Sequence, residues 1–85
     1  MLVSAFKYVD SYNNDIDVTL EYVVNPDMKY TVIYCSWHNT IYQYLGKNYI
    51  EVKRVYRSLV HDIITLGFVP DMEKLGFTIQ SEIPF

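Results

Sequence analysis

The sequence predicts an α+β fold, a small antiparallel sheet of three to five strands with one long helix, at about residues 49–66, packed on one face. Apolar and polar residues alternate over residues 16–24, as in a half-buried strand. Residues 48–67 combine a 3.6-residue apolar spacing with signals for both helix ends. A sheet with one apolar face needs a cover, and a helix with one apolar arc supplies it. With 85 residues, of which 51% are hydrophobic, the chain (1–85) is expected to form a single globular domain.

The chain opens with a predicted strand and a turn. Residues 2–9 are mostly apolar, and Leu2, Phe6 and Tyr8 are expected on the same side of the strand. The polar run DSYNND at 10–15 is typical of a turn, because Asp, Asn and Ser side chains bond to nearby backbone groups. This turn leads into the clearest strand signal of the chain.

That signal lies in residues 16–24, and residues 29–37 are expected to return beside them. The apolar side chains of the first strand share one face: Ile16, Val18, Leu20, Tyr22 and Val24. Asn25, Pro26 and Asp27 form a turn, since Pro fixes φ while Asn and Asp close local hydrogen bonds. The run KYTVIYCSW is rich in β-branched and aromatic residues, which favours a strand.

Residues 40–45 leave two structures open. A tight turn at His38 and Asn39 would lead into a fourth strand, whereas a short helix would begin at Asn39 and end at Gly46. The Thr, Ile and Tyr residues of this segment favour the strand by propensity.

The long helix is predicted at 49–66 because both of its ends carry signals. Asn48 can cap the first turn, with Glu51 three residues later, and Gly67 follows the last periodic residue. The apolar arc expected to pack on the sheet consists of Val52, Val55, Tyr56, Leu59, Val60, Ile63 and Leu66. Beyond the helix we expect a turn and a short last strand at 77–80.

A second arc of the same helix carries the candidate binding site. On a helical wheel six residues fill a sector of about 100° that faces away from the apolar arc. They are Ile50, Lys53, Arg54, Arg57, His61 and Ile64. Three interpretations remain open: docking to an acidic protein surface, contact of Lys53, Arg54 and Arg57 with nucleic-acid phosphates, or a solvated surface whose isoleucines are covered by flanking loops.

The nine tyrosines suggest a secondary aromatic surface. We expect it on the sheet face away from the helix, formed by Trp37, Tyr30, Tyr34, Tyr42 and Tyr44. Tyr and Trp are enriched at protein interfaces, and nucleotide bases also stack on such platforms where basic residues adjoin them. The alternative is that tyrosine merely suits a thin sheet, because it buries its ring and keeps its hydroxyl in water.

The motifs of catalysis, cofactor binding and metal binding are missing. The three glycines are far apart in the sequence and are explained by turns or helix ends, which excludes glycine-rich phosphate loops. Ser58, His61 and Asp62 would lie on a solvent face of a helix, without the strained turn and oxyanion donors that a catalytic triad needs. Cys35 and His38 have the spacing of half a zinc site, but no second half follows. We expect no enzymatic activity, no cofactor and no metal.

Cysteine content and charge bear on compartment and partners. With Cys35 as the single cysteine, an intrachain disulfide is impossible, which fits a reducing compartment. Neither a leader peptide nor an apolar run long enough to cross a membrane is apparent, so a cytoplasmic protein without membrane contact is expected. Acidic residues dominate 1–28 and 58–85, whereas basic residues dominate 29–57. Such a distribution serves solubility, or complementary docking with a partner or another copy.

These observations favour a small non-enzymatic binding protein that acts through a protein–protein surface. The Tyr, Ile, Asn, Asp and Lys usage is typical of low-GC coding, and it suggests a phage or mobile-element effector that inhibits a host enzyme. One alternative is a nucleic-acid-binding domain that uses the basic face of helix 49–66. Another is a structural homo-oligomer subunit. The sequence leaves the identity of the partner open.

Overall fold

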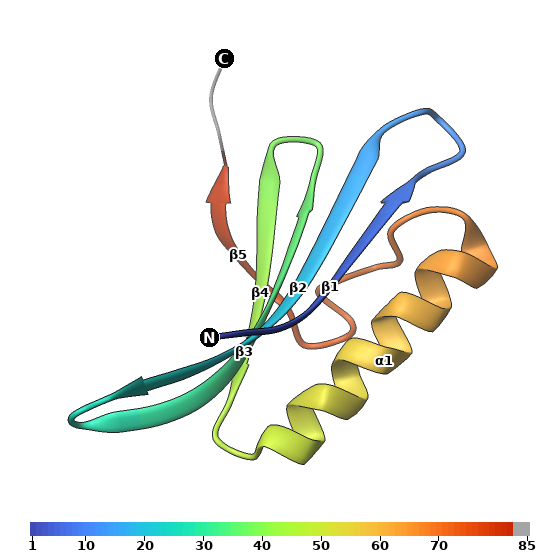
Figure 1. Cartoon of the computed structure of the whole chain (residues 1–85). Coiled ribbons are helices and arrows are strands. Elements are labelled where there is room, and N and C mark those ends of the chain that lie inside the picture. The colour runs from blue at the N-terminus through green and yellow to red at the C-terminus, as the bar shows by residue number, and fades with distance from the viewer. Residues whose placement is uncertain (83–85) are drawn as a thin grey trace.

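The computed structural model describes residues 1–82, and it confirms the predicted α+β class. One antiparallel sheet of five strands carries one helix, and the strands follow one another in the sheet in chain order (Figure 1). The elements are β1 (Leu2–Val9), β2 (Asp15–Asn25), β3 (Met28–Trp37), β4 (Thr40–Gly46), α1 (Tyr49–Leu66) and β5 (Thr78–Glu82). In the described part of the chain, no helix has the length and apolar character needed to cross a membrane.

Two tight turns set the register of the central strands. His38 and Asn39 have φ angles of 49° and 60°, and Trp37 pairs with Thr40, as in a two-residue type I′ hairpin. Residues 40–46 are therefore a strand, which settles the alternative that the sequence left open. In the preceding hairpin Asn25 pairs with Met28, and the Asn25 Oδ1 atom accepts a hydrogen bond of 3.3 Å from the Asp27 amide.

The register places the core between the sheet and α1. Val18 stands between Phe6 and Cys35, so these three side chains share the face toward the helix. The fully buried members of the core include Ile16, Val18, Leu20, Ile33, Cys35, Val52, Leu59 and Ile63. A hydrogen bond of 3.0 Å between the Ser4 and Tyr56 hydroxyls also joins β1 to the helix.

Leu2 departs from the predicted pattern of β1. Phe6 and Tyr8 pack against the core as expected, but Leu2 is 57% exposed. A bulge between Leu2 and Ser4 shifts the pairing with β2, so Leu2 falls out of line with the other two.

Both predicted helix ends are present. The Asn48 Oδ1 atom accepts a hydrogen bond of 3.1 Å from the Glu51 amide, and Gly67 has a left-handed φ of 80° with its N–H donating to the Ile63 carbonyl. Of the predicted apolar arc, only Leu66 is wrong, because it lies past the last buried position, Ile63, and is 46% exposed. At the start of α1, a Cβ on Gly46 would lie 2.7 Å from Val52 Cγ2, so a glycine permits this close approach.

The chain beyond α1 closes the open end of the core and then joins the sheet. Val69, Met72 and Phe77 are buried, and the Phe77 ring centroid lies 5.4 Å from that of Tyr44. Gly76 takes a φ of 91° before the chain enters β5, which pairs with β4 as the last strand.

A buried carboxylate organises the β1–β2 connection. Asp10 is 5% exposed, and its Oδ1 atom accepts hydrogen bonds from the Tyr12 and Asn14 amides at 2.9 and 2.8 Å. Its Oδ2 atom accepts from Asn14 Nδ2 at 3.4 Å and from Trp37 Nε1 at 2.9 Å. Next to it, Ser11 donates from its amide and its hydroxyl to the Gly67 carbonyl. The connection therefore ties β1, β3 and the end of α1 together.

Candidate docking surface

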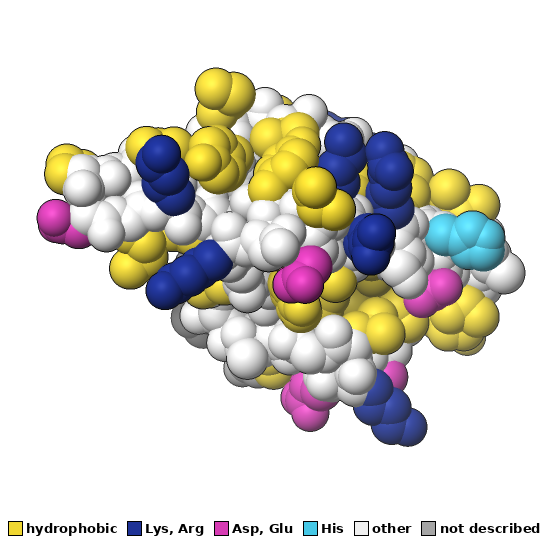
Figure 2. Space-filling model, turned by 90° about the horizontal axis from the view of Figure 1, so that it is seen from below, with side chains coloured by type: hydrophobic (Ala, Val, Ile, Leu, Met, Phe, Trp, Pro, Cys, Tyr) yellow, Lys and Arg dark blue, Asp and Glu magenta, His cyan; other side chains and the backbone are white. Residues whose placement is uncertain are grey.

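The outer face of α1 is the sector predicted from the sequence, and the structure directs it away from the sheet. Val52, Tyr56, Leu59 and Ile63 are buried, which turns the opposite side of the helix outward. On that side Ile50 is 62% and Ile64 54% exposed. We call the outer face of α1 the set Ile50, Lys53, Arg54, Arg57, His61 and Ile64. Figure 2 shows Lys and Arg side chains gathered over α1, with apolar side chains beside them.

Within the described part of the chain, the cations of this face have no ion-pair partner. Among the residues that the structure describes, Lys53, Arg54 and Arg57 form no ion pair with a carboxylate. The Lys53 Nζ atom lies 5.6 Å from the centroid of the Tyr49 ring, a cation–π contact. His61 Nδ1 lies 3.5 Å from the Thr65 hydroxyl, one helical turn along. The positive charges are therefore available to a partner.

An apolar hollow adjoins this face. It has a volume of about 620 Å³ and is lined by Met1, Leu2, Val3, Tyr22 and Tyr49. The rings of Tyr22 and Tyr49 meet edge to face with centroids 6.2 Å apart, and Tyr49 also supports Lys53. Sequence reasoning missed the hollow. The contact of Tyr49 with Lys53 could have been predicted, since the two residues are four apart on the helix. The presence of Leu2 in the hollow could not, because it depends on the bulge in β1.

The predicted aromatic surface is divided between the two faces of the sheet, so its placement on one face is wrong. Tyr30 and Tyr34 lie on the face away from α1, but Trp37, Tyr42 and Tyr44 pack against the core on the helix side. The physical reason is the two-residue period of a strand, which sends positions 34 and 37 to opposite faces. Tyr42 and Tyr44 stand opposite the core residues Cys35 and Ile33 and share their face.

The residues considered for chemistry are separated or inert. Cys35 is fully buried, and burial, aided by the nearby negative charge of Asp17, raises the pKa of its thiol to about 12. The thiol is therefore protonated at neutral pH and is a poor nucleophile or ligand. His38 lies exposed in the β3–β4 turn, with its ring 4.3 Å from that of Trp37. Within residues 1–82 no group of three or more His, Cys, Asp or Glu side chains is placed to hold a metal ion.

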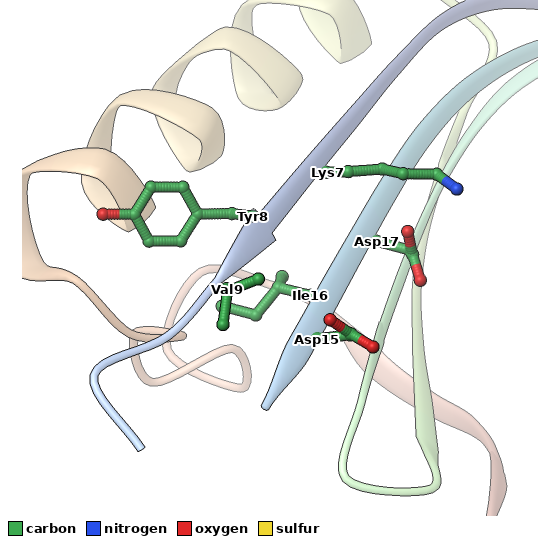
Figure 3. Close-up of a pocket in the computed structure, with 6 residues that line it drawn as sticks. All are labelled: Lys7, Tyr8, Val9, Asp15, Ile16 and Asp17. Atoms are coloured by element: carbon green, nitrogen blue, oxygen red, sulfur yellow. The ribbon is translucent and has the colours of Figure 1, made fainter. Parts of the chain in front are cut away.

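A second polar region lies on the far side of the sheet. A hollow of about 480 Å³ lies at the β1–β2 pair. Figure 3 shows that Lys7, Asp15 and Asp17 project to one side there and that Tyr8 projects toward α1. We call the sheet surface away from α1 the open sheet face. The register assigns Lys7, Asp17 and Ser36 to it, since they stand side by side on three adjacent strands.

Comparisons with protein-family models, with curated proteins and with solved structures give no match. The fold and the surface thus define a small α+β domain with an exposed basic and apolar helix face.

Proposed function

We propose that the protein is a non-enzymatic binding protein that docks the outer face of α1 onto an acidic surface of another protein. The observation that carries this proposal is a single helix face on which exposed isoleucines lie beside cations that form no ion pair with any described residue. Unpaired cations add nothing to the fold through ion pairs, and they remain free to bind carboxylates of a partner. Arginine flanked by apolar residues is typical of the energetic centre of protein interfaces.

Arg57 is the residue expected to contribute most. It lies seven residues from both Ile50 and Ile64, which is close to two helical turns in each direction, so the three side chains share nearly one line along α1. A guanidinium can bind a carboxylate through two parallel hydrogen bonds while its aliphatic stem covers apolar surface.

The geometry favours a protein over a nucleic acid as the partner. The next cation along the chain, Lys47, precedes α1 and lines a different hollow, with Met28, Tyr30 and Leu45. The outer face therefore offers three lysine and arginine side chains beside an apolar hollow, in a chain with a net charge of −3. A nucleic-acid surface would need more phosphate contacts and a positive field around them. A phage or mobile-element effector that blocks a host enzyme is the specific form of this function suggested by residue usage.

The test is a charge reversal at Arg57. The partner is first identified by a pull-down from nuclease-treated lysate, and its Kd is then measured for the wild type and for Arg57→Glu. We expect binding to weaken at least ten-fold, about 1.4 kcal/mol. The free energy of unfolding should change by no more than about 0.5 kcal/mol, because the side chain points into solvent.

Lys74→Glu is the matched control, since it reverses an exposed charge in the turn before β5 and should leave the Kd unchanged. A species that is captured from untreated lysate but lost after nuclease treatment would indicate a nucleic-acid ligand. An affinity that survives Arg57→Glu would place the site elsewhere on the molecule.

A further inference from the structure

The open sheet face has no covering layer in the described structure. α1 and the chain that follows it lie on one side of the sheet, and within residues 1–82 no helix crosses the other side (Figure 1). The apolar content of this side includes Leu45 on β4, which is 52% exposed and pairs with Val32, itself fully buried within the chain. A sheet surface with apolar content is usually packed against another element.

The charge on the open sheet face is mainly negative. Asp15, Asp17 and Glu21 share this face on β2, and the register places Lys7 of β1 among them. Lys47 is a second cation near this face, in a hollow with Tyr30 and Leu45. Figure 3 shows the Asp15 and Asp17 carboxylates projecting on the same side of the ribbon. This strand therefore presents an acidic row.

Aromatic and apolar side chains lie beside the acidic row. Tyr30 and Tyr34 come from β3, and Leu45 from β4 is 52% exposed. Burial raises the pKa of the Tyr34 hydroxyl, with further increases from Tyr30 and from the negative charge of Glu21, while a hydrogen bond with Gln80 lowers it. An open hollow of about 310 Å³ crosses this region, lined by Asp17, Thr19, Tyr34, Ser36, Ile41 and Gln80.

The two faces of the molecule are complementary. On the outer face of α1, exposed isoleucines lie beside cations that form no ion pair within residues 1–80. The open sheet face carries carboxylates with tyrosines and an exposed leucine. A helix of one molecule laid on the bare sheet of another would give that sheet a helix on each side. It would also supply carboxylates for Arg54 and Arg57.

We propose that a second copy of this chain is a partner of the outer face of α1, which docks onto the open sheet face of the neighbouring molecule. This inference rests on the proposed docking role of α1 and names one acidic surface that it fits. Because the two faces differ and lie on opposite sides of the molecule, the contact is heterologous, and each added copy leaves one face of each kind free. Association therefore grows with concentration and weakens with salt, since it depends on exposed charges.

The experiment is sedimentation velocity of the purified chain over about 10 μM to 1 mM, at about 50 mM and about 500 mM salt. At low salt we expect the average mass to rise steadily with concentration above the 10.1 kDa of the monomer, and at high salt to fall back toward it. Arg57→Glu and Glu21→Lys should each weaken self-association at least ten-fold, because each places like charges opposite one another. The double variant, with both Arg57→Glu and Glu21→Lys, again places opposite charges at the contact and should associate. Lys74→Glu should behave as the wild type.

Three results would overturn this inference. They are a monomer at every concentration, a closed dimer that Arg57→Glu does not affect, and a double variant that is no better than either single one. Circular dichroism of each variant shows whether it is folded. A wild type that stays monomeric while Arg57→Glu still weakens binding to another protein would overturn self-association alone. Retained binding of that other protein by Arg57→Glu would instead overturn the proposed function.

Discussion

At the scale of single residues, Thr31 is a buried group without a partner. Its side chain is fully buried at the centre of β3, and its hydroxyl has no hydrogen-bond partner among the residues that the structure describes. Its strand neighbours are Tyr22 and Gly46, and the latter offers no side chain at all. A buried hydroxyl that loses its water without gaining a protein partner costs about 1–3 kcal/mol.

Thr31→Val should therefore stabilise the protein, by about 1 kcal/mol. The substitution keeps the β-branched shape that a strand favours and removes the unpaired hydroxyl. The measurement is the urea midpoint at constant m-value. Thr19→Val is the matched control, because Thr19 is half-buried on the open sheet face, and it should change stability by no more than about 0.5 kcal/mol. A lower midpoint for Thr31→Val would show that the hydroxyl has a partner in solution.

At the scale of the element, α1 has an inner face for the fold and an outer face for binding. The inner residues Val52, Tyr56, Leu59 and Ile63 are buried. Among the described residues the outer cations form no ion pair, and Lys53 lies over the Tyr49 ring. Substitutions of side chains that share no contact partners usually have additive effects on free energy. Substitutions on the inner face should therefore change stability, and those on the outer face should change binding.

Leu59→Ala tests the inner face. Leu59 is 1% exposed and belongs to the core, so its truncation should cost about 2–5 kcal/mol through lost burial and the cavity left behind. Leu66→Ala makes the same chemical change at a 46% exposed position of the same helix and should cost about 1 kcal/mol or less. The thermal midpoints of the two variants give the comparison. Equal losses would mean that the helix is rotated relative to the sheet.

At the scale of the whole molecule, local patterns predicted the elements but not every contact between them. Alternation at 16–24 and the caps at Asn48 and Gly67 depend on neighbours in the chain, so they predicted the sheet, the helix and the outward direction of Arg57. Leu2 was misplaced because a bulge in β1 shifts its pairing with β2. Trp37 was misplaced because the two-residue period of β3, which sends it to the face opposite Tyr34, was not applied to it.

Asp10 is the clearest case of such a distant contact. In the sequence it is one of several polar letters in a turn, and Trp37, which donates to its carboxylate, lies 27 residues away. Desolvation by itself would raise the pKa of this carboxyl, but the bonds from the Asn14 amide, the Trp37 indole, the Tyr12 amide and the Asn14 side chain together outweigh it. The pKa of Asp10 therefore lies below its ordinary value, so the folded state favours the charged form.

This depressed pKa predicts how the stability of the whole molecule depends on pH. A carboxyl whose pKa is lower in the folded state contributes stability above its unfolded pKa, near 4, and loses it as pH falls through the folded value. Asp10→Asn removes the charge but keeps one carbonyl acceptor, so it should destabilise the protein at about pH 7. As pH falls below about 4, the difference from wild type should shrink, because the wild-type carboxyl becomes protonated as well. The other carboxylates titrate in both proteins and cancel in the comparison.

Trp37 is the single tryptophan and donates to Asp10, so its fluorescence follows both global unfolding and the loss of this bond. A stability difference that stays constant from about pH 7 to pH 3 would show that the charge of Asp10 does not hold β1, β3 and the end of α1 together.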